Sequence, residues 1–292
     1  MQRVVECVPN FSEGRRSEVI DAIAAAASVR NVYLLDRHMD ADHNRSVLTL
    51  AGAPETIVEG VFAAVNKATE LIDLRAQRGA HPRMGATDVI PFVPVRGVTM
   101  DDCVKLARDA GQRIADELHI PVYLYEAAAT RPERVRLETI RLASPEERGL
   151  PDFGPAALHP TAGAVSIGAR KFLIAFNINL ETSDVRVAKE IAKRIRTSGG
   201  GLPGLKAMGV FLKGRNQAQV SMNVTDYEQT SLRLVFETVT KEAQQMGIRV
   251  AASELVGLVP TAALDPAFDL HIEYFSPSMV LENRLADIIP SV

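Results

Sequence analysis

A histidine held between glycines and a proline is the strongest candidate for chemistry in this sequence. His81 stands in the stretch RGAHPRMGATD, which runs from Arg78 to Asp88. Pro82 restricts the backbone of His81, and the flanking glycines permit sharp turns. An imidazole held in this way could accept and donate a proton near neutral pH. A loop histidine bonded to backbone or water would show the same residues, so at this point both interpretations stay open.

A second polar stretch, HMDADHNR from His38 to Arg45, combines histidine and aspartate. Imidazole and carboxylate groups suit several divalent metals, but the spacing matches no established ligand motif. Aspartate and asparagine are also common turn formers. We therefore predict no metal site here. Arg45 is the better candidate, because a guanidinium can hold a substrate carboxylate with two parallel hydrogen bonds.

A third stretch, GPAALHPTAG from Gly154 to Gly163, is rich in small residues. Small residues would let a flat ligand approach the backbone closely. A plain linker has the same composition, so the residues alone do not decide between a binding segment and a linker.

Composition narrows the classes of function. The 33 basic and 36 acidic residues give a net charge of −3, which argues against a general binder of nucleic acid or anionic membranes. No stretch approaches the roughly 20 apolar residues of a membrane span, and the first residues do not resemble a signal peptide. Two cysteines, Cys7 and Cys103, make neither a disulfide framework nor a four-cysteine zinc site. We expect a soluble, cytoplasmic protein.

Hydrophobic periodicity predicts the elements that position these stretches. In the first half we expect strands at about 3–9, 32–37, 45–51, 88–95 and 121–126, helices at 16–28 and 54–71, a helix capped by Thr99 and Asp102, and a charged surface helix within 129–151. In the second half we expect strands at 171–180, 205–212, 217–224 and 248–252, and helices at 183–197 and from a Thr225–Glu228 capping box to about 246.

Both halves follow the order β-α-β-β-α-β, which is typical of ferredoxin-like, split β-α-β units. The predicted fold is therefore α/β (α+β), with an N-terminal subdomain at 1–170 and a C-terminal subdomain at 171–292. The length of 292 residues agrees with about two domains. The boundary is expected in the segment 151–170, which is rich in proline, glycine and alanine. A crevice between two such sheets is a plausible ligand site.

Several long strings resemble the glutamate formimidoyltransferase (formiminotransferase) family, in order from the first strand to about residue 260. They are VECVPNFSEGR at Val5–Arg15, HNRSVLTLAG at His43–Gly52, HPRMGATDVIPFVPVRGVTMDDC at His81–Cys103, PVYLYE at Pro121–Glu126, DFGP at Asp152–Pro155, GARKFLIAFNINL at Gly168–Leu180 and LVGLVP at Leu255–Pro260.

The resemblance implies transfer of a formimidoyl group between N-formimidoyl-L-glutamate and tetrahydrofolate, in histidine degradation. It implies two α/β subdomains with the folate, a co-substrate, bound between them, a homodimer, and no metal. It places the family's catalytic histidine at His81. The folate-binding segment implied by the resemblance consists of Gly154, Pro155, Ala156, Ala157, Leu158, His159, Pro160, Thr161, Ala162 and Gly163. Some family members carry a cyclodeaminase domain, which this chain is too short to include, so ammonia release is expected from a separate protein.

The sequence departs from the family at three of these places. His38 stands where relatives often have aspartate, and His159 and Ala162 replace residues that are apolar or aromatic in relatives. Ala162 removes a surface on which a ring could stack, so folate contacts are expected to differ in detail. Residues 265–292 match only weakly.

The implied chemistry needs proton transfer rather than an enzyme nucleophile, because the attacking amine belongs to a substrate. One imidazole with a pKa near ~6.5 could serve as base and then as acid, and the resemblance assigns this role to His81. Since both substrates carry carboxylates, we expect a local basic field from Arg45, Arg83 and Arg170. Two alternatives remain open: transfer of a formyl group from N-formyl-glutamate, and a folate-binding protein without catalysis.

Overall fold

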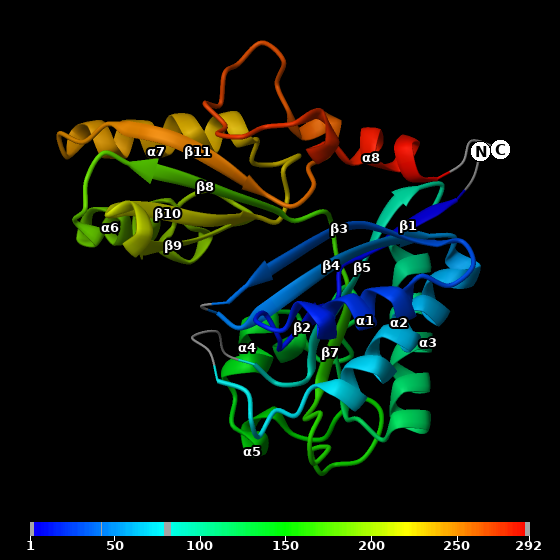
Figure 1. Ribbon diagram of the computed structural model, residues 1–292. Coiled ribbons are helices and arrows are strands. Elements are labelled where there is room, and N and C mark those ends of the chain that lie inside the picture. The colour runs from blue at the N-terminus through cyan, green and yellow to red at the C-terminus, as the bar shows by residue number, and fades with distance from the viewer. Residues whose placement is uncertain (1–2, 42, 79–82, 290–292) are drawn as a thin grey trace. The chain divides into compact units, whose positions relative to one another are not determined.

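The computed structural model describes residues 3–41, 43–78 and 83–289, and these residues form two separate β-sheets (Figure 1). The chain divides into two compact units, the first ending at Arg170 and the second beginning at Lys171. Each sheet is accompanied by helices, so the fold is a mixed α/β fold, as the sequence predicts at this coarser level.

The first unit contains a seven-stranded sheet. Its elements are β1 (Val4–Cys7), β2 (Asn10–Phe11), α1 (Ser17–Ala27), β3 (Val32–Asp40), β4 (Arg45–Gly52), α2 (Pro54–Leu71), β5 (Thr87–Arg96), α3 (Met100–Leu118), β6 (Val122–Glu126), the short 3₁₀ helix η1 (Pro132–Arg134), α4 (Leu137–Leu142), α5 (Pro145–Arg148) and β7 (Val165–Ala169). Both β1 and β2 lie between β4 and β5 in antiparallel pairing, and β3 extends the sheet beyond β4. On the other side, β7 runs parallel to β5, and β6 runs parallel to β7.

The two faces of this sheet differ. One face packs with α1, α2 and α3 into a large apolar core that contains Phe11 and Phe92. The opposite face carries a smaller cluster with Val89, Tyr125 and, from α4, Ile140. Because side chains alternate between faces along a strand, polar residues between the core positions are directed to this second face.

Two predicted helices of the first unit agree closely with the structure. Helix α2 begins at Pro54, whose missing N–H is tolerated in the first helical turn. The capping box before α3 is confirmed, because Thr99 Oγ1 accepts the Asp102 N–H at 3.1 Å and Asp102 accepts the Thr99 N–H at 3.0 Å.

Three predictions in the first unit need correction. The strand expected at 3–9 is interrupted at Pro9, which has no N–H for the ladder, and continues as β2. No strand is predicted in 151–170, yet β7 lies there, buried at every position. A parallel strand covered on both faces lacks the alternation that predicts strands. The charged segment 129–151 forms η1, α4 and α5 rather than one surface helix, and Arg134 within it is buried.

The second unit contains a four-stranded antiparallel sheet in the order β11-β8-β10-β9. Its elements are β8 (Ile174–Leu180), α6 (Val185–Ile195), the 3₁₀ helix η2 (Thr197–Gly199), β9 (Leu205–Leu212), η3 (Lys213–Arg215), β10 (Gln217–Val224), α7 (Leu232–Gln245), β11 (Val250–Val256), η4 (Thr261–Ala263), η5 (Pro277–Met279) and α8 (Leu281–Ile288). Helices α6 and α7 cover one sheet face and form its core.

The start of α7 differs from the prediction. The helix begins at Leu232 rather than at Thr225, and Ser231 caps it by accepting the Leu234 N–H at 3.2 Å. Thr225 instead donates its hydroxyl to Gly204 O at 2.9 Å. The spacing of Thr225 and Glu228 matches a capping box, but the side chain of Thr225 is used to close a turn.

Candidate functional site

The stretch that follows His81 and the small-residue stretch 154–163 lie side by side in the first unit. Ala86 N–H donates to Ala162 O at 2.9 Å, and Ala164 N–H donates to Met84 O at 3.0 Å. Between these bonds, Gly85 and Gly163 form an antiparallel β-bridge. Two motifs about 80 positions apart are thus joined by backbone pairing. His81 itself, with residues 79, 80 and 82, lies outside the described residues.

The segment 154–163 is a turn whose backbone is organised by His159. The N–H groups of His159 and Gly163 each donate to the other residue's carbonyl, at 2.9 and 3.0 Å. The Nδ1 atom of His159 accepts the Ala162 N–H at 3.0 Å. Leu158 is 45% exposed, whereas Ala162 is buried in the main core. An apolar ligand could therefore contact Leu158, but not the methyl group of Ala162.

Arg45, the predicted ligand for a carboxylate, lies at the start of β4. Its Nη2 donates to Asn10 Oδ1 on β2. The pKa of Arg45 is lowered from 12.5 to about 10, chiefly by burial and also by the charge of Arg141, while Asp88 and Asp40 oppose the shift. The guanidinium therefore remains charged at neutral pH in a partly buried setting, where a carboxylate would be held strongly.

Asp88 connects this region to the segment after His81. Its Oδ1 accepts the Met84 N–H at 2.8 Å, and its Oδ2 accepts from Arg141 Nη2. The carboxylate is 3% exposed and the Arg141 side chain 15% exposed, so the ion pair is largely buried. The negative charge of Asp88 also works to raise the pKa of Arg83. Asp88 therefore lies close to Arg45, Arg83 and Arg141.

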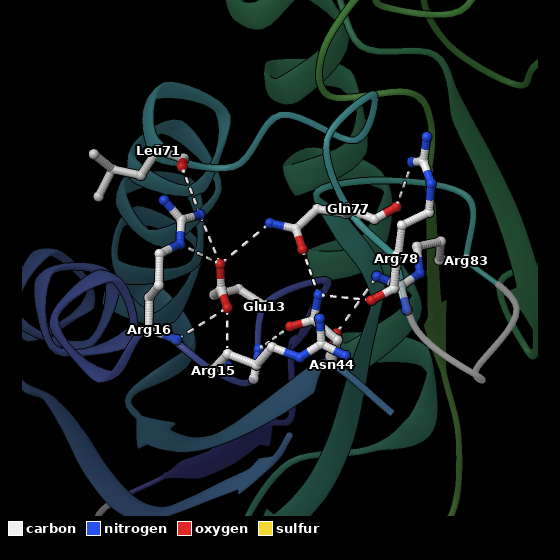
Figure 2. Close-up of polar contacts among 9 residues, drawn as sticks. Glu13, Arg15, Arg16, Asn44, Leu71, Gln77, Arg78 and Arg83 are labelled. Atoms are coloured by element: carbon white, nitrogen blue, oxygen red, sulfur yellow. Dashed lines mark hydrogen bonds and ion pairs between the residues drawn. The ribbon is translucent and has the colours of Figure 1, made fainter. Parts of the chain in front are cut away.

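Arg83 is held by backbone oxygens of the turn before β4. Its guanidinium donates to His43 O at 2.9 Å and to Asn44 O at 3.5 Å. Figure 2 shows Arg83 beside Asn44. Burial lowers the pKa of Arg83, and the nearby positive charge of Arg15 acts in the same direction. Two of the three arginines predicted to form a basic field, Arg45 and Arg83, thus lie near one turn.

The third arginine, Arg170, influences Glu6 and Tyr125. Its backbone N–H donates to Phe92 O at 3.0 Å, and its positive charge works to lower the pKa of both side chains. Glu6 is 2% exposed on β1. Burial raises the pKa of Glu6 from 4.5 to about 7, with Arg170 opposing that shift.

Comparison with known proteins covers both units. A model of the formiminotransferase domain, N-terminal subdomain, matches residues 4–170, and a model of the formiminotransferase domain matches residues 175–289. The chain belongs to the formiminotransferase family. The passage from one family model to the other falls where the first compact unit ends, at Arg170.

Individual relatives in the formiminotransferase family are similar over most of this chain. A glutamate formimidoyltransferase of Streptococcus pyogenes serotype M1 is 47% identical over 98% of this chain and 99% of its own length. A glutamate formimidoyltransferase of Thermoplasma acidophilum is 47% identical over 97% of each chain. The formimidoyltransferase-cyclodeaminase of Rattus norvegicus is 49% identical over 90% of this chain, which covers 51% of that protein.

The residues that sequence reasoning missed lie mostly within the strings that carry the family resemblance. Glu6 and Asn10 are in VECVPNFSEGR, and Asp88 is in the stretch that follows His81. An acidic residue in the apolar run VVECV was a usable signal for Glu6. Arg141 stands in a segment of mixed charge, where nothing in the sequence distinguishes it from its neighbours.

Two further features of the described residues bear on the possible ligands. No group of three or more His, Cys, Asp or Glu side chains there is arranged to hold a metal ion. In the stretch from His38 to Arg45, the Nδ1 atom of His43 instead contacts the Asp40 carboxylate at 2.7 Å.

None of the described helices has both the length and the apolar character needed to cross a membrane.

Proposed function

We propose that this formiminotransferase-family chain transfers a formimidoyl group between N-formimidoyl-L-glutamate and tetrahydrofolate, in histidine degradation. The observation that carries the proposal is the pairing of Met84–Ala86 with Ala162–Ala164. It joins the segment that follows His81 to the segment 154–163, in a chain that is 47% identical to named glutamate formimidoyltransferases over nearly its full length.

In this proposal, the segment from Gly154 to Gly163 contacts tetrahydrofolate, the co-substrate. Small exposed residues there and the exposed side chain of Leu158 suit contact with a flat ring. The guanidinium of Arg45, charged and half-buried, would hold a substrate carboxylate. When bound, tetrahydrofolate supplies the amine that forms the new C–N bond.

His81 is the proposed general acid and base. It takes the proton that leaves the attacking amine, and it gives a proton to the glutamate nitrogen when the old C–N bond breaks. One imidazole can do both because the two transfers occur in sequence. No serine or cysteine nucleophile of the protein is required. Holding the two substrates together can lower the barrier by about 7–11 kcal/mol in ideal cases.

We also propose that both halves are ferredoxin-like units with the ligand crevice between them. In the second unit the order β8, α6, β9, β10, α7, β11 and the sheet order β11-β8-β10-β9 support this. On the sheet face opposite α6 and α7, the buried amides of Asn179 and Gln219 bond each other at 2.8 Å. In the first unit, the side chain of Arg45 on β4 donates to the side chain of Asn10 on the paired strand β2. A homodimer, a cytoplasmic location and a separate cyclodeaminase partner complete the proposal.

The test is an assay of the purified protein with tetrahydrofolate and one of two donors, followed through the absorbance of the folate product. N-formimidoyl-L-glutamate is expected to give turnover and N-formyl-L-glutamate much less. Turnover with the formyl donor alone would replace the proposed reaction with formyl transfer. Binding of folate without turnover on either donor would show a folate-binding protein instead.

A further inference from the structure

Asn44 is a buried asparagine in the turn between β3 and β4. It is 2% exposed, and its φ of +48° lies in the left-handed region, which asparagine tolerates better than most residues. Asparagine is common in turns, so its conformation alone needs no special role. The bonds of its side chain are less ordinary for a turn residue.

The amide of Asn44 is bonded on both sides. Its Oδ1 accepts the Gly14 N–H at 2.9 Å, and its Nδ2 donates to Gln77 Oε1 and to Arg78 O, the latter at 3.1 Å (Figure 2). An amide offers one acceptor oxygen and two N–H donors. Both kinds of group are therefore used, and the two donors are directed at Gln77 and Arg78.

The backbone carbonyl of Asn44 is bonded by the side chain of Arg83, which follows His81 in the chain. Arg83 Nη1 donates to Asn44 O at 3.5 Å, and Arg83 Nη2 donates to the preceding carbonyl, that of His43, at 2.9 Å. Arg78 and Arg83 are the described residues nearest to His81 on its two sides. One residue, Asn44, therefore contacts the chain both before and after the proposed acid and base.

Asn44 is itself held by a buried carboxylate. Gln77 bridges Asn44 to Glu13, since its Nε2 donates to Glu13 Oε2 at 3.2 Å. Glu13 is 1% exposed and also accepts the N–H groups of Arg15 and Arg16, at 2.9 and 3.1 Å (Figure 2). Burial works to raise the pKa of Glu13, but these bonds together hold it below its ordinary value, so the carboxylate stays charged.

Gly14 fits this arrangement because no side chain could stand there. A Cβ atom on Gly14 would lie 2.2 Å from Asp40 O and 2.5 Å from the backbone N of Arg45. The loop before α1 therefore approaches the β3–β4 turn at backbone contact distance. This close approach brings the Gly14 N–H to Asn44 and limits the movement of the Asn44 side chain.

We propose that Asn44 is a positioning residue for the transfer reaction. Its side chain holds the Arg78 carbonyl and its own carbonyl accepts from the Arg83 guanidinium, so Asn44 constrains the described residues on both sides of His81. This inference rests on the proposed function, since it assigns Asn44 an effect only through His81. Glu13, Gln77 and Gly14 support Asn44 and do not act on the substrates.

The variant Asn44→Gly tests this inference. Glycine adopts a φ of +48° without strain, so the change removes the amide bonds and leaves the turn conformation allowed. Because misplacing a reacting group by about 1 Å can cost on the order of 100-fold in rate, we expect kcat to fall by about that factor. The KM for tetrahydrofolate should change by less than about threefold, because the lost bonds act on the chemical step.

The double variant Asn44→Gly/His81→Ala separates positioning from general damage. If Asn44 acts through His81, adding Asn44→Gly to His81→Ala lowers kcat no further. Independent, additive losses would overturn the inference and leave the proposed function standing. A His81→Ala variant with wild-type kcat would overturn the role of His81, and the inference with it. Absence of turnover in the wild-type protein would contradict the proposed function itself.

Asn216 provides a matched control in the second unit. It has a φ of +49°, is exposed, and lies at the turn between β9 and β10. Asn216→Gly should leave kcat and KM unchanged. If Asn44→Gly does not fold, as judged by its thermal unfolding, Gln77→Leu takes its place. That change removes the partner of the Asn44 amide, and we expect about a 10-fold loss of kcat that again disappears when His81 is alanine.

Discussion

Gly85 and Gly163 face each other in an antiparallel β-bridge, and neither position has room for a Cβ atom. A Cβ on Gly85 would lie 2.0 Å from Ala164 O, and one on Gly163 would lie 2.3 Å from Met84 O. Gly163 also has a φ of +70°, which strains any L side chain. The contact between the stretch that follows His81 and the segment 154–163 therefore depends on both glycines.

Gly163→Ala is expected to weaken the proposed folate site and the stability of the first unit. The methyl group must push Met84 away, which opens the bridge, and the left-handed backbone adds its own strain. We expect a loss of about 3 kcal/mol in the free energy of unfolding. Urea denaturation measures this loss, and titration with tetrahydrofolate should show weaker binding in the folded variant.

Gly247 supplies the control for backbone strain. Its φ of +71° is nearly that of Gly163, but a Cβ there would meet nothing within 4 Å. Gly247→Ala should therefore cost only the conformational strain, about 1 kcal/mol, with no effect on folate binding. Equal losses of stability in the two variants would show that the contact with Met84 has no energetic importance.

Glu6 predicts a dependence of stability on pH. Burial raises its pKa from 4.5 in the unfolded chain to about 7 in the folded one. Between pH 4.5 and pH 7, Glu6 is therefore protonated in the folded chain and ionised in the unfolded chain. Protonation of Glu6 thus stabilises the fold at low pH, and this stabilisation is lost as pH rises from about 4.5 to 7. A shift of this size corresponds to roughly 3 kcal/mol. Glu6→Gln should be more stable than the wild type above pH 7 and similar to it near pH 4.

Glu133 serves as the comparison for this pH series. It is exposed on η1, so Glu133→Gln should leave the curve of unfolding free energy against pH parallel to that of the wild type. The two curves are obtained from urea denaturation at pH 4 to 8. A Glu6→Gln variant that is destabilised at pH 8 would contradict a buried, poorly solvated carboxylate at this position.

Local residue patterns predicted most of the elements, and contacts distant in sequence decided the exceptions. The helix at Pro54 and the capping box at Thr99 depend on neighbouring residues, so the sequence predicts them well. Strand β7 escaped prediction because both of its faces are covered, by residues far away in the chain. Thr225 satisfies the spacing of a helix cap, but its hydroxyl bonds Gly204, 21 residues earlier.

In the candidate site, too, the sequence predicts individual residues but not the contacts between distant segments. Arg45, His81 and the segment 154–163 could be singled out by residue type and by resemblance to the family. The pairing of Met84 with Ala164 could not be predicted, because backbone bonds between distant segments leave no pattern in either segment. Likewise, Arg141 reaches Asp88 from 53 positions away, in a segment that the sequence predicted to lie on the surface.

The ion pair of Asp88 and Arg141 predicts a large effect of removing one charge. Asp88→Asn keeps an oxygen for the Met84 N–H but leaves the guanidinium of Arg141, which is 15% exposed, without its carboxylate. Breaking a buried pair in this way costs about 3 kcal/mol or more. We expect that loss in urea denaturation. Adding Arg141→Met should recover part of it, because the unpaired charge is then gone.

Asp184 and Arg186 form the matched exposed pair at the start of α6. Asp184→Asn should leave the unfolding midpoint nearly unchanged, because exposed ion pairs contribute little to stability. If Asp88→Asn were as harmless as Asp184→Asn, the carboxylate of Asp88 would have to be well solvated, contrary to its 3% exposure.

The assignment of His81 predicts a separation between folate binding and turnover. His81→Ala removes the group that carries the proton between the two nitrogens, and loss of a general acid and base lowers the rate by about 10²- to 10⁴-fold. Tetrahydrofolate should still bind with nearly wild-type affinity, because the segment 154–163 is unchanged. Single-turnover kinetics with N-formimidoyl-L-glutamate measures the rate, and fluorescence titration measures the binding.

His271 in the second unit distinguishes this effect from the loss of any imidazole. Its side chain is 62% exposed and its φ is +50°, so asparagine is a suitable replacement. His271→Asn should keep the wild-type kcat. Added imidazole should restore part of the activity of His81→Ala, because a free base can then carry the proton in the space left by the ring. A near-normal kcat for His81→Ala without added imidazole would mean that the substrates exchange this proton with water or with another group, and would remove His81 from the chemistry.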